Sequence, residues 1–365
     1  METYSRIAIK VGSNVLTRPD GRLELTRMSA LVDQIAELRR MDKEVILISS
    51  GAVAAGKGEM KECTGLDAVS ARQLFSAVGQ IKLMNRYDEF FGGYGLRCGQ
   101  VLTMKESFST RRHYLNQKQC MEVMLEHGIV PVVNENDTVS VTELMFTDND
   151  ELSGLVATMM GVDVLLILSN VDGVYDGDPA LPTSALLREV VPDARLDTDS
   201  IVQTSRSSLG RGGMITKFRM AQKVASEGIT VIIANGKREH ILTDILLERN
   251  EVPYTRFLPG SHPVSGVKKW IAHSEGFAKG KIQINEGAYR ALLSSQAASL
   301  LPVGVVAVEG QFEKDDIVQI LAPDGSAFAL GKISYSTEEV QSRMGLQGER
   351  PFVHYNNLYI EWRTE

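Results

Sequence analysis

The sequence predicts an α/β protein with a mainly parallel, open sheet sandwiched by helices, followed by a small C-terminal β-barrel-like domain. Up to residue 258, short runs of Val, Ile and Leu alternate with longer segments of helical periodicity. This alternation is typical of parallel strands that are covered on both faces. Clusters of Gly, Ser, Asn and Asp follow the apolar runs, where such sheets bind ligands. After residue 258 the pattern changes to short β runs, which indicates a second domain.

Each apolar run is short enough to be a buried strand, and the predicted strands are 6–12, 44–49, 96–102, 128–133, 162–168 and 229–234. Between them, apolar residues recur at helical spacing, which predicts helices at 26–40, 68–91, 111–127, 149–160 and 214–227. The alternation of the two kinds of segment predicts the crossover connections that parallel strands require.

The segment LPGSHPVSGVKKW, residues 258–270, contains two prolines and two glycines and is predicted to be a linker. From about residue 275, the runs KIQI, VVAV, DIVQIL, AFALGKI and LYIEW predict strands, and 286–299 predicts one helix. We therefore expect an α/β domain at 1–258, a linker at 259–274 and a small β-rich domain at 275–365.

The composition is that of an ordinary globular protein: 365 residues, 43% hydrophobic, with a formal net charge of -7. The negative charge makes nucleic acid an unexpected partner. No apolar run is long enough to span a bilayer, and no signal peptide is apparent. Three scattered cysteines without CxxC spacing are typical of a reducing compartment, so we expect a cytoplasmic protein without a membrane partner.

The first polar cluster is IKVGSNVLT, residues 9–17, at the end of a predicted strand. Gly12 and Ser13 begin a loop whose backbone N–H groups can approach a phosphate, and Lys10 supplies a positive charge. An ordinary strand whose lysine extends to the surface is the alternative. The chain contains no Walker A motif.

The second cluster, SSGAVAAG at 49–56, also follows a predicted strand. Ser49 can cap a following helix, and Gly51 and Ala52 leave N–H groups open to a carboxylate or phosphate. An ordinary strand–turn–helix junction with a serine cap is the alternative.

Six short Asn and Asp side chains occur within 17 residues, in NENDTVS (134–140) and FTDNDELS (146–153). At strand ends they suit an ammonium group or the water shell of Mg²⁺. Turns and helix caps are the alternative, but this density next to an apolar strand favours function. EF-hand spacing is absent. These residues are Asn134, Asn136, Asp137, Asp148, Asn149 and Asp150.

Two further loops follow later strands. SNVDGVYDGDP, 169–179, is either a hairpin turn or a loop beside a nucleotide. GRGGMITK, 210–217, combines three glycines with Lys217 and suits a lid over phosphates, with a plain mobile loop as the alternative.

In this order the motifs resemble the glutamate 5-kinase family of the amino acid kinase superfamily. They are K-x-G-S-x-V-L, SSGAVAAG, NENDTVS, FTDND, DGVYDGDP and G-x-GGM-x-TK. NENDTVS together with FTDND is specific to this branch. VKKWIA, INEGA and SLLPVGV extend the resemblance, and the C-terminal part resembles a PUA domain. The resemblance implies the amino acid kinase fold at 1–258 and a PUA-like domain at 275–365.

The resemblance implies transfer of the γ-phosphoryl group of ATP to the γ-carboxylate of L-glutamate, with Mg²⁺, as the first step of proline synthesis. Lys10 and Lys217 would contact the phosphoryl group and Asp150 would orient both lysines. The implied substrate contacts are Ser50, Gly51, Ala52, Asn134, Asp137, Asp148 and Asn149. The implied ATP contacts are Lys10, Gly12, Ser13, Ser169, Asn170, Arg211, Gly212, Gly213, Met214 and Lys217. No protein ligand to a metal is implied.

Two positions depart from the family pattern: Asn170, where Asp is frequent, and Arg211, where Thr is frequent. The first removes a negative charge beside the nucleotide and the second adds a positive one. We expect Asn170→Asp and Arg211→Thr to change the KM for ATP without abolishing activity. Steady-state kinetics test this expectation, and an unchanged KM for ATP in both variants would contradict it.

The family also implies proline as an inhibitor, acting near Glu143 and its neighbours 138–147, a homo-oligomer (dimer or tetramer), and channelling to glutamate-5-semialdehyde dehydrogenase. PUA domains bind RNA in other proteins. Residues 275–365, however, contain 8 Lys and Arg against 12 Asp and Glu, a net charge of 8 − 12 = −4, so RNA is disfavoured and assembly or regulation is expected.

Two other functions remain open from the residues. A sibling enzyme, such as an acetylglutamate, aspartate or uridylate kinase, shares DGVYDGDP and GGMITK, but NENDTVS and the PUA-like tail argue against it. An RNA-binding module with a degenerate kinase half is the second. Intact Lys10, Asp150 and Lys217 argue against that degeneracy.

Overall fold

The computed structural model describes residues 4–60, 65–139, 149–178, 181, 183–191, 213–260, 266–272, 274–294 and 297–360. The chain forms two compact units. The first comprises Met1–Lys105 and Asn116–Pro263, and the second comprises Glu106–Leu115 and Val264–Glu365. Residues 106–115, which the sequence places in the first domain, thus group with the second unit.

The first unit is built on an eight-stranded sheet with the order β3-β4-β2-β1-β5-β7-β8-β6. The predicted mainly parallel sheet is confirmed, because among the described strands of this sheet only β7 and β8 pair in antiparallel fashion. The six predicted strands all form, and β6 and β8 are additional. The strands are β1 (Arg6–Val11), β2 (Glu44–Ser49), β3 (Arg97–Thr103), β4 (Ile129–Glu135), β5 (Val164–Ser169), β6 (Glu189–Val190), β7 (Thr230–Asn235) and β8 (Tyr254–Phe257).

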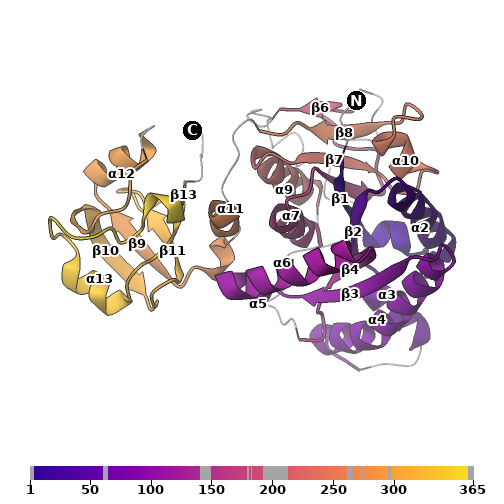
Figure 1. Cartoon of the computed structure of the whole chain (residues 1–365), viewed down its shortest axis with the longest axis horizontal. Coiled ribbons are helices and arrows are strands. Elements are labelled where there is room, and N and C mark those ends of the chain that lie inside the picture. The colour runs from indigo at the N-terminus through magenta and orange to yellow at the C-terminus, as the bar shows by residue number, and fades with distance from the viewer. Residues whose placement is uncertain are drawn as a thin grey trace. The chain divides into compact units, whose positions relative to one another are not determined.

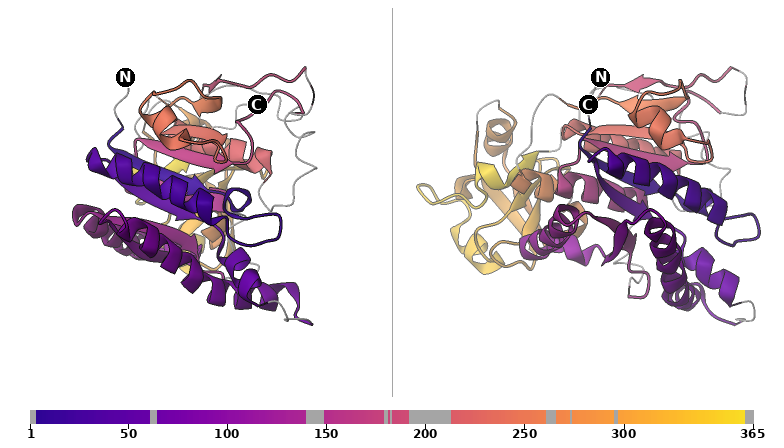
Figure 2. Two further views of the ribbon diagram at one scale, coloured as in Figure 1. Left: turned by 90° about the vertical axis from the view of Figure 1, so that its right-hand side faces the viewer. Right: turned by 45° about the vertical axis from the view of Figure 1, so that its right-hand side comes forward.

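Helices cover both faces of this sheet (Figures 1 and 2). Helices α2 and α4 pack on β2 and β3, whereas α7 and α9 pack on β1, β5, β7 and β8. The five predicted helices are confirmed, and no helix in the described residues is long and apolar enough to cross a membrane. The helices are α1 (Ser13–Leu16), α2 (Leu25–Arg40), α3 (Ala52–Glu59), α4 (Ala68–Gly92), α5 (Glu106–Ser109), α6 (Arg111–Glu126), α7 (Asn149–Met160), α9 (Met214–Ser226) and α10 (Ile241–Leu246).

The middle of the sheet is fully apolar. Every residue of β5, VLLILS, is buried, as expected for a strand covered by helices on both sides. The long helix α4 begins where the Asp67 side chain accepts hydrogen bonds from the backbone N–H groups of Val69 and Ser70. Because β1, β2, β4 and β5 run in the same direction, their carboxyl ends meet at one edge of the sheet, together with the polar residues that follow them.

The second unit contains a five-stranded sheet with the order β10-β9-β11-β12-β13. Trp270 of α11 (Gly266–Ala272) donates its indole N–H to the carbonyl of Phe108, 2.8 Å away, so segment 106–115 is tied into this unit. The helix predicted at 286–299 ends at Leu293, so its C-terminal part is a correction. The other elements are β9 (Gly280–Ile284), α12 (Glu286–Leu293), β10 (Val305–Gly310), β11 (Ile317–Leu321), β12 (Ala327–Lys332), α13 (Thr337–Arg343) and β13 (Leu358–Ile360).

Candidate active site

Two lysines meet one buried aspartate at the carboxyl edge of the first sheet. Asp150, in the first turn of α7, is only 1% exposed. Lys217 of α9 places its Nζ 2.8 Å from Asp150 Oδ2, and Lys10 of β1 forms an ion pair with Asp150 Oδ1. These three residues are far apart in the sequence and come from three elements, so the fold alone creates the cluster.

The cluster of Lys10, Lys217 and Asp150 contains more positive than negative charge. Burial by itself would raise the pKa of Asp150, but the attraction of Lys10 and Lys217 outweighs it and holds that pKa below the usual range. Asp150 is therefore ionised at neutral pH. Two ammonium groups around one carboxylate leave a formal charge of +1 at a nearly buried position, which suits an anionic group such as a phosphate.

The loop after β1 and the start of α9 both lie beside these lysines. Gly12 donates its N–H to the carbonyl of Leu168 over 3.0 Å, and a Cβ at Gly12 would lie 3.6 Å from Lys10 Nζ. Ser13 begins α1 and is exposed. Gly213 is the N-cap of α9 and Met214 its first residue, so a helix N-terminus, which attracts anions, precedes Lys217 by one turn.

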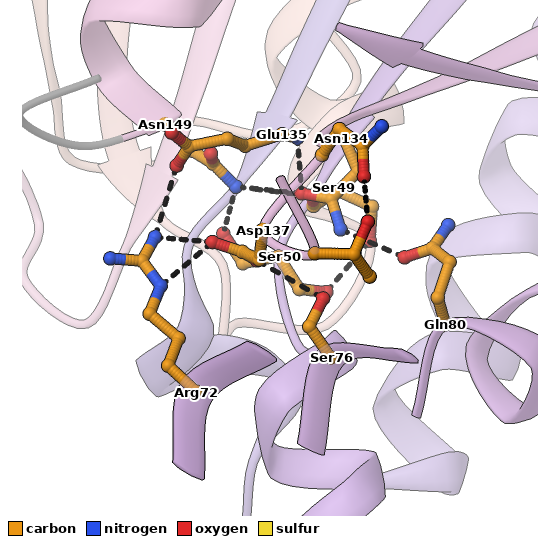
Figure 3. Close-up of polar contacts among 11 residues, drawn as sticks. Ser49, Ser50, Arg72, Ser76, Gln80, Asn134, Glu135, Asp137 and Asn149 are labelled. Atoms are coloured by element: carbon orange, nitrogen blue, oxygen red, sulfur yellow. Dashed lines mark hydrogen bonds and ion pairs between the residues drawn. The ribbon is translucent and has the colours of Figure 1, made fainter. Parts of the chain in front are cut away.

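A second polar cluster is centred on Asn149, the residue before Asp150 (Figure 3). Its amide nitrogen lies 3.0 Å from Ser50 Oγ, 3.1 Å from Asn134 Oδ1 and 3.2 Å from the Ser49 carbonyl. The Asn134 amide donates in turn to Gln80 of α4 over 3.0 Å. The structure thus brings together Ser50, Asn134 and Asn149, three of the predicted substrate contacts.

Asp137 is held by a residue that the sequence analysis did not single out. Arg72 of α4 donates from Nε to Asp137 Oδ1 over 2.7 Å, and its Nη2 contacts Glu135 Oε2 at 3.0 Å (Figure 3). Ser76 donates to Asp137 Oδ2 over 3.4 Å. Burial raises the pKa of Asp137, although Arg72 and then Ser76 act against that rise.

Helix α4 therefore contributes to the site through Arg72, Ser76 and Gln80. These residues are spaced four apart, so they lie on one face of the helix. Within a segment already predicted to be a helix, this polar i, i+4, i+8 pattern was the signal available in the sequence. Periodicity alone does not say which strand end the face meets.

The start of α3 corrects one prediction. Ser49 does not cap this helix: it is the last residue of β2, fully buried, and its hydroxyl lies 2.8 Å from Tyr87 OH and 2.9 Å from the Ser50 carbonyl. Gly51 is the N-cap, with φ 106°, a backbone conformation that favours glycine. Ala52 follows as a buried first residue. Gly51, as a glycine, has no side chain with which to cap the N–H groups of this first turn.

The end of β5 and the loop after it carry two further predicted nucleotide contacts, Ser169 and Asn170. Ser169 is buried at the end of β5, and its hydroxyl lies 3.4 Å from the amide oxygen of Asn170, which is exposed. Asp172 accepts two hydrogen bonds of 2.8 Å from Arg238, which lower its pKa, and one of 3.0 Å from Asn235. The loop is thus fixed to the end of β7. Asp148, Arg211, Gly212 and Glu143 lie outside the described residues.

Residues 5–235 match the model of the amino acid kinase family, and residues 280–351 match that of the PUA domain. The glutamate 5-kinase of Bacteroides thetaiotaomicron is 59% identical over 360 residues, which are 99% of each chain. This chain belongs to the glutamate 5-kinase branch of the amino acid kinase family. The glutamate 5-kinase of Chlorobaculum tepidum is 44% identical over 362 residues, 98% of each chain. The resemblance found in the motifs and the predicted fold are both confirmed, and the chain is a kinase.

Proposed function

We propose that this kinase transfers the γ-phosphoryl group of ATP to the γ-carboxylate of L-glutamate, forming γ-glutamyl phosphate in the first step of proline biosynthesis. The observation that carries the proposal is the adjacency of Asn149 and Asp150. These consecutive residues at the start of α7 join the polar cluster around Ser50 and Asn134 to the lysine pair. One short turn of helix thus places a site suited to an amino acid beside a site suited to a phosphate.

The reaction needs little covalent chemistry from the protein. An ionised γ-carboxylate oxygen forms a bond to the γ-phosphorus as the bond to the bridging oxygen breaks, and ADP leaves with that electron pair. No general base is required, because a carboxylate is already deprotonated at neutral pH. Lys10 and Lys217 neutralise charge on the transferring group, and Asp150 keeps both ammonium groups aimed at one place.

Mg²⁺ would bind with the nucleotide. Among the described residues there is no group of three or more His, Cys, Asp or Glu side chains that would hold a metal ion. Asp150 has both carboxylate oxygens in ion pairs with lysines. These residues fit an ion held mainly by the ATP phosphates and water. Bound there, Mg²⁺ supplies further neutralisation of the phosphate charge.

The proposed reaction is tested by trapping acyl phosphate with hydroxylamine in the presence of ATP. The substrates compared are glutamate, aspartate, acetylglutamate and buffer alone. We expect hydroxamate only with glutamate. A signal with another acid in place of glutamate would assign a sibling reaction, and no signal with any acid in folded protein would contradict the proposal.

The dependence of glutamate binding on pH tests the role of Asp137. An ionised Asp137 pairs with the α-ammonium of glutamate, and burial raises the pKa of this carboxyl group. As the pH falls through that raised pKa, Asp137 takes up a proton and the pairing is lost. We expect the KM for glutamate to increase about tenfold per pH unit below it, with the KM for ATP unchanged. In Asp137→Asn the KM should be high at every pH. If the KM for glutamate of that variant rose equally steeply at low pH, the assignment would be contradicted.

Proline is proposed to inhibit by competing at the same cluster. It carries an α-carboxylate and a cationic nitrogen in the same relation as glutamate, but no γ-carboxylate to accept a phosphoryl group. We expect proline to raise the apparent KM for glutamate without changing kcat. Inhibition that persists at saturating glutamate would place the inhibitor elsewhere.

A further inference from the structure

Two buried hydroxyl groups, which the proposed reaction does not use, hold the peptide between Ser50 and Gly51. These are the hydroxyls of Ser49 and of Tyr87 on α4. Their oxygens lie 2.8 Å apart, and the Ser49 hydroxyl donates to the Ser50 carbonyl over 2.9 Å. Ser49 has a single hydroxyl proton, so Tyr87 is the donor to Ser49. Burial raises the pKa of Tyr87, so its phenol keeps that proton. The hydrogen bonds therefore run in one direction, from Tyr87 through Ser49 to the Ser50 carbonyl.

The direction of the Ser50 carbonyl fixes the direction of the Gly51 N–H, because both belong to one planar trans peptide and point in opposite directions. Gly51 has a φ of 106°. A flip of this peptide plane would turn that φ to a negative value, which glycine adopts about as readily as a positive one. The backbone of Gly51 therefore does not select the orientation of the peptide. The hydrogen bond from Ser49 to the Ser50 carbonyl selects it.

The Gly51 N–H points to the side of the chain that carries the polar cluster around Asn149. Successive side chains of an extended chain lie on opposite sides. Ser49 contacts Tyr87, whereas the Ser50 hydroxyl lies 3.0 Å from the amide nitrogen of Asn149 (Figure 3). The Ser50 carbonyl faces the Ser49 hydroxyl, so the opposed Gly51 N–H faces away from Tyr87. Within the described ranges of the chain, no carbonyl accepts a hydrogen bond from this N–H.

The same N–H lies near the lysine that meets the transferring phosphoryl group in the proposed reaction. Ser50 donates its own N–H to the Val11 carbonyl over 3.3 Å. Gly51 therefore follows β2 near the level at which Gly12 follows β1. A Cβ at Gly12 would lie 3.6 Å from Lys10 Nζ, and neighbouring strands are about 4.8 Å apart. The γ-carboxylate of glutamate has to reach this place to attack the phosphoryl group.

We propose that Tyr87 and Ser49 are positioning residues that aim the Gly51 N–H at the γ-carboxylate of glutamate. This inference rests on the proposed phosphorylation of glutamate. One carboxylate oxygen accepts the hydrogen bond from Gly51 and becomes the carbonyl oxygen of the acyl phosphate. The other oxygen is thereby oriented to form the bond to phosphorus. Neither hydroxyl touches the substrate, because Tyr87 acts through Ser49 and Ser49 acts through the peptide. Without them, a flipped peptide would present the Ser50 carbonyl oxygen to the carboxylate and repel it.

The test uses the full-length protein with four changes: Ser49→Ala, Tyr87→Phe, the double variant Ser49→Ala/Tyr87→Phe, and Tyr94→Phe as the control. Tyr94 also donates its phenol hydroxyl to a side chain, that of Asp33, but it is exposed and lies apart from Ser49. Hydroxamate formation gives the kcat and the KM values for glutamate and ATP. Chemical denaturation gives the free energy of unfolding of each variant.

Ser49→Ala should lower kcat about 30-fold, because the Ser50 carbonyl loses the donor that sets its direction. Tyr87→Phe should lower kcat by about fivefold, since Ser49 keeps its bond to the carbonyl but loses the group that orients its hydroxyl. Both variants should retain the KM for ATP, and Tyr94→Phe should retain kcat. An unchanged kcat in Ser49→Ala, or a rise in the KM for glutamate alone, would overturn the proposal.

The free energy of unfolding distinguishes positioning from a purely structural role. Ser49→Ala leaves the Tyr87 phenol buried without its partner, which destabilises the protein. The double variant removes that phenol oxygen as well, so it should be more stable than Ser49→Ala. Its kcat should nevertheless stay as low as that of Ser49→Ala, because the carbonyl still lacks its donor. A kcat that recovers together with stability would show a merely structural role and reject the proposal.

The parent protein separates this inference from the proposed reaction. A parent that forms no glutamate-dependent hydroxamate would reject the phosphorylation of glutamate itself. An active parent whose kcat is unchanged by Ser49→Ala would reject only the positioning role of Ser49 and Tyr87.

Discussion

Replacing Lys217 with alanine is expected to lower kcat about 10³-fold while the protein stays folded. Lys217 provides one of the two ammonium groups that meet Asp150, 2.8 Å from Oδ2. The phosphoryl group gains negative charge on its oxygens as it transfers, so losing one of two fixed cations raises the barrier more than it weakens substrate binding. Single-turnover and steady-state measurements of hydroxamate formation give kcat and both KM values for the comparison.

The stability of Lys217→Ala should remain near that of the parent, because Asp150 keeps its ion pair with Lys10. Arg219→Ala is the matched control: Arg219 lies on the same helix, is exposed, and carries the same charge. We expect this control to retain kcat. A similar loss of rate in both variants would mean that the general charge of α9, and not the position of Lys217, supports the reaction.

The largest effect on stability is expected from Gly79→Ala. Helices α3 and α4 cross so closely that a Cβ at Gly79 would lie 1.8 Å from the Ala52 carbonyl oxygen and 2.4 Å from the Gly56 nitrogen. Both are backbone atoms, so the helices must separate. We expect the free energy of unfolding to fall by about 3 kcal/mol, as measured by chemical denaturation.

This crossing also positions the site, because Arg72, Ser76 and Gln80 lie on α4 and Ala52 begins α3. The KM for glutamate should therefore rise in Gly79→Ala as well. Gly92→Ala is the control on the same helix, with open space around its Cβ. There alanine should be neutral or stabilise the protein by up to about 1 kcal/mol. Equal destabilisation by the two substitutions would contradict the importance of the close crossing.

Local pattern predicted most of the first unit. Strands such as β5 are continuous apolar runs, and helices such as α4 are long and periodic. The type of each element can therefore be predicted from its own residues, without knowledge of its neighbours in the fold. The missed elements are short. β6 (Glu189–Val190) and β8 (Tyr254–Phe257) lie at the edge of the sheet, where pairing with a neighbour decides whether a few residues become a strand. Helix α3, AVAAGKGE, was expected after Ser49 but without an end point, because its glycines weaken the helical signal.

The candidate site likewise contains residues that the sequence predicted and residues that it did not. The rule that ligands bind beyond the carboxyl ends of parallel strands was enough to select Lys10, Ser50 and Asn134 from the sequence. It could not select Arg72, because this residue follows no strand and meets Asp137 only across 65 residues of chain. Ser49 shows the opposite error: a serine before a helix is a common cap, yet here it belongs to a strand and is buried against Tyr87.

The sequence by itself determined the fold class, the motifs of the family and the side chains with the chemistry of phosphoryl transfer, since all of these are written in local runs of residues. Only the tertiary structure decided which charges meet: that Lys10 and Lys217 share Asp150, that Arg72 joins Glu135 to Asp137, and that two glycines let α3 cross α4. The physical reason is the distance along the chain over which each interaction acts. Periodicity and propensity act between neighbours in sequence, whereas ion pairing and close packing act between atoms that folding brings together from distant parts of the chain.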